Sequence, residues 1–199
     1  MGQNQGQTKQ LLRSQLLAAR SRLAADDVAR RSVAACSRVL ALPVFLAARH
    51  VVLYSAIATE VDPADIAAAA GRLGKTLYYP VTSRDRFEFS SRGDGCAREP
   101  ATLLPPDTRD VCFLVPGLGF DLRGVRLGRG SGWYDRALAR HTTGVRVGLA
   151  YDFQVVLSLP EASWDVRMDA VVTEVRVLDG DTQRRGSEGV PPCLRPYWS

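Results

Sequence analysis

The feature of this chain that most constrains its fold is a series of short, nearly uninterrupted apolar runs, each as long as one strand. The runs lie at 50–57, 75–80, 111–115, 145–150 and 170–173. Strands that are buried on both faces read as continuous apolar runs, and this is typical of parallel sheets covered by helices. Because stretches with helical spacing separate the runs, we expect an α/β fold: a single three-layer α/β/α domain with a mainly parallel central sheet.

Apolar residues at helical spacing predict where the helices lie. We expect one helix from Thr8, a second from an Asp26 N-cap to about Leu40, and a third, rich in alanine, that ends near Leu73 with Gly74 as its C-cap. A further helix is expected from 131 or 132 to 141, and a small antiparallel excursion at 87–89. The α/β domain should therefore span 8–179, between a flexible leader at 1–7 and a polar tail at 180–199.

The charge of the chain favours anionic ligands. Lys and Arg number 26 against 21 Asp and Glu in 199 residues, and two of the basic residues, Lys9 and Lys75, are lysines.

No apolar run reaches the ~18 residues that span a bilayer, and the N-terminus lacks the apolar segment of a secretory signal, so we expect a cytoplasmic protein. The four cysteines are scattered and there are two histidines, so disulfides, a zinc site and a histidine triad are poor candidates. We expect Cys112, His50 and His141 to be structural residues. His141 should lie at a helix C-terminus, where a positive charge is favourable.

A glycine-rich segment after the apolar run at 111–115 carries the strongest functional signal. Gly128, Gly130 and Gly132 lie just before a predicted helix and are interleaved with Arg126 and Arg129. Glycines let the backbone approach a ligand with exposed N–H groups, so the segment indicates a phosphate site, although it matches neither the Walker A nor the dinucleotide motif. The stretch 69–76 resembles Walker A superficially, but it lacks the first glycine and follows a helix rather than a strand.

The segment from Arg126 to Arg136, RLGRGSGWYDR, resembles the signature of the 5-formyltetrahydrofolate cyclo-ligase family. Arg129 and Ser131 stand where glycine is frequent in the family, and Trp133 where tyrosine is common. Other segments resemble the family in the same order along the chain, from 9 to 177: Lys9 to Arg13, Glu60 to Asp62, Arg98 to Pro100, Val115 to Asp121, Gly148 to Gln154 and Asp165 to Glu174.

The resemblance implies an enzyme that converts 5-formyltetrahydrofolate to 5,10-methenyltetrahydrofolate with ATP and Mg²⁺, through a phosphorylated formyl intermediate. It implies ATP contacts from Lys9, Arg13, Arg126, Leu127, Gly128, Arg129, Gly130, Ser131, Gly132, Trp133 and Tyr134. It implies folate contacts from Ser55, Glu60, Arg129, Gly130, Ser131, Gly132 and Trp133. Arg129 and Tyr134 would be catalytic, and Asp135 and Asp165 would bind Mg²⁺, with Asp169 competing for the place of Asp165.

Several of these residues also have ordinary structural interpretations. Lys9 and Arg13 could lie on a solvated helix face, Glu60 could cap a helix, and Asp135 and Asp165 could stabilise a helix start or a turn. We expect a reduced folate as substrate, no nucleic-acid or membrane partner, and a monomer or weak homodimer. One alternative is a catalytically inactive nucleotide- or RNA-binding homologue, for which a basic stripe could be formed by Arg123, Arg126, Arg129, Arg136 and Arg140. Another, by analogy of fold, is a CoA-transferase or a sugar-phosphate isomerase.

Overall fold

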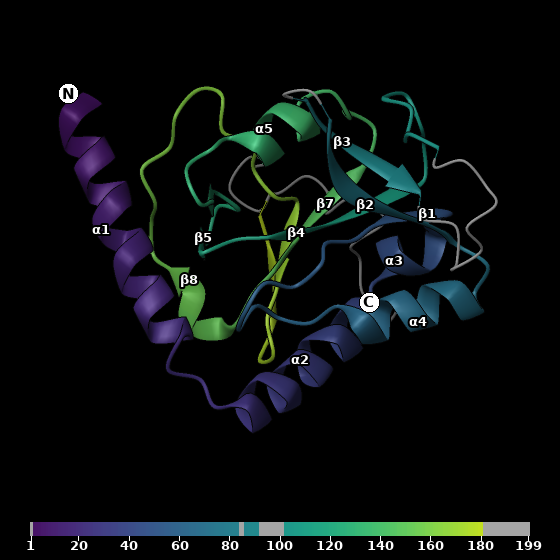
Figure 1. Cartoon of the computed structure of the whole chain (residues 1–199), viewed down its shortest axis with the longest axis horizontal. Helices are drawn as coiled ribbons and strands as arrows, with labels where there is room; N and C mark the ends of the chain where they lie inside the picture. The colour runs from purple at the N-terminus through teal and green to yellow at the C-terminus, as the bar shows by residue number, and fades with distance from the viewer. Residues whose placement is uncertain (1, 84–85, 92–101, 181–199) are drawn as a thin grey trace, which may run out of the picture.

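The computed structural model describes residues 2–83, 86–91 and 102–180, and its chain path is shown in Figure 1. The segment Arg98 to Pro100, which resembles the family, and nearly all of the predicted polar tail lie outside the described residues. The α-helices are α1 (Gly2–Arg20), α2 (Ala25–Leu40), α3 (Pro43–Ala47), α4 (Ala64–Arg72) and α5 (Trp133–Leu138). The strands are β1 (His50–Val52), β2 (Thr76–Ser83), β3 (Arg86–Ser91), β4 (Val111–Pro116), β5 (Gly119–Asp121), β6 (Arg126–Leu127), β7 (Val145–Leu149), β8 (Val155–Val156), β9 (Ala170–Val172) and β10 (Val177–Asp179).

The main sheet has seven strands in the order β10-β9-β7-β4-β1-β2-β3. Its five inner strands, from β9 to β2, pair in parallel, whereas β3 and β10 add antiparallel edges. The five apolar runs supply these inner strands, so the predicted mainly parallel α/β sheet is confirmed. The predicted excursion at 87–89 is also confirmed, because it forms the centre of β3.

Helices cover both faces of this sheet, as the alternation of β4 shows. Cys112 and Leu114 pack into the core shared with α2, α3 and α4, while Val111, Phe113 and Val115 pack into the core shared with α5. Figure 1 shows α2, α3 and α4 on one side of the strands and α5 on the other. Burial on both faces explains why β4 carries no polar residue at alternate positions.

A second sheet of three short strands, in the order β6-β5-β8, was not predicted. Its strands lie within and beyond the glycine-rich segment, and they are too short to show a pattern in the sequence. Leu12 and Leu16 of α1 pack on this sheet against Val125, Leu127 and Leu159. Helix α1 therefore lies beside β8 rather than on the main sheet, as Figure 1 shows.

Some predicted boundaries are wrong. Helix α1 begins at Gly2 and so includes most of the expected leader, whose glutamines are compatible with a helix. The N-cap of α2 is Ala24, and Asp26 lies in the first turn, where its charge still favours the helix dipole. Strand β1 ends at Val52, and α5 ends at Leu138 rather than at His141. Among the described helices, none has the length and apolar character needed to cross a membrane.

Candidate active site

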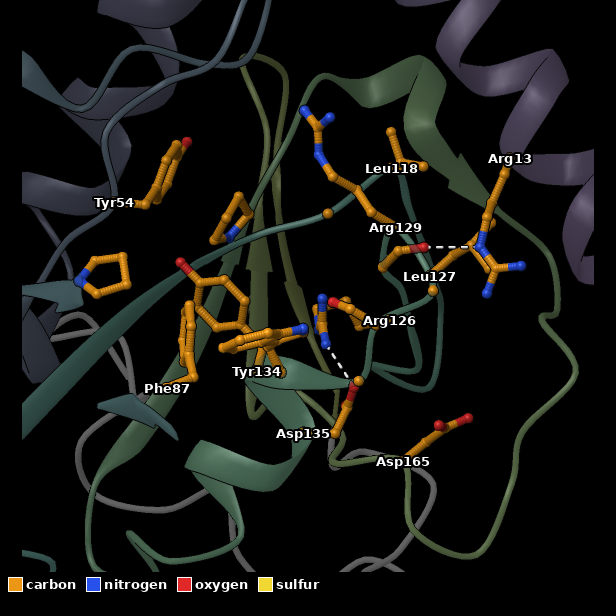
Figure 2. Close-up of a pocket in the computed structure, with 18 of the residues that line it drawn as sticks. Arg13, Tyr54, Phe87, Leu118, Arg126, Leu127, Arg129, Tyr134, Asp135 and Asp165 are labelled. Atoms are coloured by element: carbon orange, nitrogen blue, oxygen red, sulfur yellow. Dashed lines mark hydrogen bonds and ion pairs between the residues drawn. The ribbon is translucent and has the colours of Figure 1, made fainter. Parts of the chain in front are cut away.

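A cavity of about 480 Å³ opens where the carboxyl ends of β1 and β4 meet. From β1 the chain proceeds to β2 toward one edge of the sheet, and from β4 it proceeds to β7 and β9 toward the other edge. The adjacent strands β1 and β4 therefore form the switch point of a doubly wound sheet. Ligands bind at this place in open α/β sheets because the loops leave the two strands in opposite directions. Tyr54 and Ser55 after β1, and Pro116 and Gly117 at the end of β4, line the cavity (Figure 2).

The glycine-rich loop forms one wall of this cavity. Gly130 and Gly132 have φ angles of 111° and 65°, in the left-handed region that favours glycine. A Cβ atom at Gly128 would lie 2.7 Å from Nη1 of Arg126, closer than real contacts allow. Because α5 has six residues, its dipole is small, and most of the positive charge at this wall comes from the arginines.

Every residue that the sequence singled out for ATP, folate or metal binding, except Asp169, lines this one cavity. From the first half of the chain these are Lys9, Arg13, Ser55 and Glu60. From the second half they are Arg126, Leu127, Gly128, Arg129, Gly130, Ser131, Gly132, Trp133, Tyr134, Asp135 and Asp165. The tertiary structure thus brings together segments that are far apart in the sequence.

Helix α1 contributes its cations one turn apart on the face that looks toward the loop. Lys9 Nζ lies 2.7 Å from a carboxylate oxygen of Asp165, and Nε of Arg13 donates to the carbonyl oxygen of Gly128 at 2.9 Å. Leu12 and Leu16 turn to the small sheet, so the apolar stripe fixes the direction of the two cations. Lys9 and Arg13 therefore do not lie on a solvated helix face.

Two carboxylates face the same cavity. Asp135 pairs with the buried Arg126 at 2.8 Å, and its other oxygen accepts the amide N–H of Val166 at 3.3 Å. Asp165 accepts from Lys9 and from a backbone amide of its own loop. Asp169 lies elsewhere: its carboxylate accepts the Arg146 amide at 2.7 Å, and it does not line the cavity. Of the two competing aspartates, the structure brings Asp165 to the site.

The opposite end of the cavity is aromatic. The Phe87 ring lies 4.9 Å from that of Tyr134 and 5.7 Å, edge to face, from that of Trp133. Arg126 lies over the Tyr134 ring at 5.4 Å, and burial raises the pKa of Tyr134 well above its ordinary value, so the phenol keeps its proton. Figure 2 shows Phe87 and Tyr134 on one side of the pocket and Arg13 and Asp165 on the other.

Glu60 has a different role from helix capping. One of its oxygens accepts from Arg129 at 2.9 Å, and the other accepts the backbone N–H of Ile57 at 3.1 Å. The N-cap of the following helix, α4, is Pro63. The capping interpretation of Glu60 is therefore wrong, and its carboxylate is an ionic part of the cavity wall.

Sequence reasoning missed several residues that line the cavity: Tyr54, Ile57, Pro80, Phe87, Pro116, Gly117, Leu118 and Trp164. Tyr54 and Ile57 follow β1, and 116–118 lie at and just beyond the end of β4, so the carboxyl-end rule could have found these five once the strand order was known. Gln154, which is buried, holds the loop after β4 by donating to the carbonyl oxygens of Gly117 and Leu118.

The residues expected to be structural lie away from the cavity. Cys112 is buried in the core, and Gly74 has a positive φ at the end of α4. Lys75, for which the sequence indicated no role, donates from Nζ to the carbonyl oxygens at the end of α3. His141 is also buried, between Phe89 and Phe113. Because α5 ends at Leu138, His141 is not the C-terminal residue of the helix, and burial, with help from two nearby arginines, lowers its pKa; the expectation of a favourable cation at a helix end is therefore wrong.

The fold and the cavity define the class of this protein. It is a doubly wound α/β domain with a ligand pocket at its switch point, cationic at one end and aromatic at the other. The sequence profile of the 5-formyltetrahydrofolate cyclo-ligase family matches residues 5–174. The chain belongs to this family, and this makes it an enzyme of the cyclo-ligase type.

Individual proteins agree with this assignment. The chain is 31% identical over 162 residues to the 5-formyltetrahydrofolate cyclo-ligase of Escherichia coli K12, covering 73% of this chain and 88% of that protein. It is 28% identical over 192 residues to the mouse cyclo-ligase, covering 83% of this chain and 93% of that one. In structure it is similar to the 5,10-methenyltetrahydrofolate synthetase of Aquifex aeolicus, with a TM-score of 0.77, 32% identity, and coverage of 92% of this chain and 97% of that one.

Proposed function

We propose that this chain converts 5-formyltetrahydrofolate to 5,10-methenyltetrahydrofolate at the expense of ATP, with Mg²⁺ as the metal ion. The N5-formyl oxygen attacks the γ-phosphorus and ADP leaves. N10 then attacks the formyl carbon, the carbon–oxygen bond breaks, phosphate departs with the former formyl oxygen, and N10 loses its proton. Phosphate is a far better leaving group than hydroxide. The observation that carries the proposal is the single cavity with a charged end and an aromatic end.

The charged end suits the ATP phosphates. Lys9, Arg13, Arg126 and Arg129 all line the cavity, and within the described part of the chain Nε of Arg126 is buried without a hydrogen-bond partner. A buried unpaired donor is costly, and phosphate oxygens are suitable acceptors for it. The same loop would contribute its backbone N–H groups and the residues Leu127, Gly128, Gly130, Ser131, Gly132, Trp133 and Tyr134.

The two aspartates of the cavity fit a magnesium ion that is shared with phosphate. The described residues contain no group of three or more metal-ligating side chains that could hold a metal without a ligand. Mg²⁺ in phosphoryl-transfer sites is bound by one or two carboxylates together with substrate phosphates, and Asp135 and Asp165 supply this number. When bound, the ion would neutralise charge on the phosphates. Lys9, which pairs with Asp165, and Arg126, which pairs with Asp135, are cations of the same cavity that can also contact the phosphates.

The aromatic end suits a reduced folate. Trp133 and Phe87 offer apolar faces for a flat ring, and the Glu60 carboxylate can accept from ring N–H groups. Ser55, exposed in the loop after β1, adds a hydroxyl that can donate or accept. Ser131, Gly130 and Gly132 also line the cavity, so the glycine loop would contact both substrates.

Arg129 and Tyr134 are the proposed catalytic side chains. Arg129 is half-exposed and joined to Glu60, so its guanidinium can turn toward the transferred phosphoryl group and stabilise its charge. Tyr134 keeps its proton because burial raises its pKa, so it can donate a hydrogen bond but cannot act as a base at neutral pH. Catalysis here consists of holding the reacting atoms together and stabilising charge, which requires no covalent catalyst.

The test is the absorbance of methenyltetrahydrofolate after the protein is mixed with 5-formyltetrahydrofolate, ATP and Mg²⁺. We expect a signal that requires all three, and folded protein that gives no ATP-dependent signal would overturn the proposal. Asp135→Asn should raise the Mg²⁺ concentration needed for half-maximal turnover, because it removes one metal-binding charge. Asp26→Asn, on the exposed first turn of α2, is the matched control and should titrate like the wild type.

The RNA-binding alternative has less support. Of its five arginines, Arg123 pairs with Asp121, Arg126 with Asp135 and Arg129 with Glu60. Arg126 is also buried, so it offers no surface to a nucleic-acid backbone. These arginines do not form the unpaired basic stripe that phosphate-backbone recognition needs.

A further inference from the structure

Arg20, the last residue of α1, is the largest of the fully buried side chains in the described structure. Its side chain is 2% exposed, and its Nε has no hydrogen-bond partner among the described residues. Arginine is seldom buried unless it is paired, because removing its charge from water is costly. Arg20 does not line the cavity, so direct ligand binding does not explain its burial.

The partner of Arg20 is the cavity residue Glu60. Nη2 of Arg20 lies 3.5 Å from Oε1 of Glu60, and the same oxygen accepts from Nη2 of Arg129 at 2.9 Å. The other carboxylate oxygen accepts the Ile57 amide. Two arginines thus share one carboxylate oxygen: Arg20 from the buried side and the half-exposed Arg129 from the cavity side.

The electrostatics make these three residues one unit. Burial lowers the pKa of Arg20, the Glu60 charge acts in the opposite direction, and the Arg129 charge lowers the pKa further. Two cations on one carboxylate leave a surplus positive charge. If Arg129 turns to a phosphoryl group, Arg20 remains as the cation that holds Glu60, and the repulsion between the two arginines is relieved.

We propose that Arg20 is a positioning residue for the folate-binding end of the cavity. It fixes the Glu60 carboxylate from behind, so that Arg129 can leave that carboxylate while Glu60 keeps the orientation needed by the folate ring. This inference rests on the proposed function. It adds a residue outside the cavity, and outside the motifs in the sequence, to the binding machinery.

The first experiment compares Arg20→Met with Arg22→Met, which alters an exposed arginine in the turn just after α1. Arg20→Met should raise the KM for 5-formyltetrahydrofolate about tenfold, because Glu60 loses a charged partner, and leave the KM for ATP within about twofold of the wild type. Arg22→Met should change neither. An Arg20→Met enzyme with an unaltered KM for the folate, or with both KM values raised equally, would overturn the assignment.

The second experiment separates positioning from a merely structural role. If Arg20 acts through Glu60, the Arg20→Met/Glu60→Gln double variant should have the same folate KM as Glu60→Gln, whereas independent effects would multiply and contradict the proposal. Should Arg20→Met not fold, Arg20→Lys keeps the cation at a different reach and should still raise the folate KM; an unchanged KM would count against the role. A wild-type protein without turnover would instead refute the proposed function itself.

Discussion

Replacing Gly128 by alanine tests whether the glycine loop is built around Arg126. The φ angle of Gly128 lies outside the left-handed region, so alanine can adopt the backbone conformation, and the obstacle is steric. The added Cβ would lie 2.7 Å from Nη1 of Arg126 and 3.4 Å from its Cζ. The guanidinium must therefore retreat by several tenths of an ångström, in a place where its side chain is 5% exposed and bonded to Asp135 at 2.8 Å.

The size of the effect follows from that contact. A hydrogen bond between charged groups contributes about 1.5–3 kcal/mol, and a displaced guanidinium retains part of it. Alanine also lowers the conformational entropy of the unfolded chain, and this offsets about 0.4–1 kcal/mol of the lost stability. We expect a net loss of about 1 kcal/mol in the free energy of unfolding, or about 2–4 °C in Tm for a domain of this size. The KM for ATP should rise, because Arg126 moves away from the phosphates.

The assay pairs thermal unfolding with kinetics, and Gly71→Ala in α4 is the matched control. A Cβ at Gly71 meets nothing within 4 Å, so alanine there should stabilise the helix by about 0.5–1 kcal/mol and leave the KM for ATP unchanged. A Gly128→Ala protein with the Tm and ATP KM of the wild type would refute the steric reasoning, and so would equal effects at both glycines.

Three further outcomes are expected. Burial raises the pKa of the Cys36 and Cys112 thiols to about 12, so iodoacetamide should alkylate neither thiol in the native protein near neutral pH. Peptide mapping would measure this, and rapid modification of both thiols would contradict their burial. Asp165→Asn should raise the Mg²⁺ concentration needed for half-maximal turnover, whereas Asp169→Asn should lower Tm and leave that concentration unchanged. The reverse pattern would assign the metal-binding role to Asp169. Because burial lowers the pKa of His141, the folded state binds protons less readily than the unfolded state, so the free energy of unfolding should fall as pH drops below about 6.5. His141→Phe should weaken that dependence in urea titrations, and an equal pH slope in both proteins would exclude His141 as its source.

The main sheet could be predicted because burial on both faces leaves a local signal. The runs at 111–115 and 145–150 read as strands without any knowledge of their neighbours, since each strand is covered by helices on both sides. The small sheet could not be predicted in this way. Strands such as β6, with two residues, are stabilised by their partners and by α1, and two residues carry no periodicity.

The candidate site could likewise be predicted only in part. Arg126 to Asp135 could be identified because the loop is contiguous and contains many charged, glycine and aromatic residues. Ion-pair partners and orientation could not, because Lys9–Asp165 and Arg129–Glu60 join residues far apart in the chain. The same holds for Phe87, whose strand was expected but whose approach to Trp133 depends on the packing of β3 against α5.

The sequence by itself determined the fold class, the family resemblance and the side chains of the glycine loop, because each of these depends on residues that are close together in the sequence. Tertiary structure decided which aspartate reaches the cavity, what Glu60 holds, and that Arg20 lies buried behind it. These are consequences of strand order and helix packing, which set distances between residues that the chain connects only through long segments. Electrostatic energies depend on such distances and on burial, so they become defined only when the chain is folded.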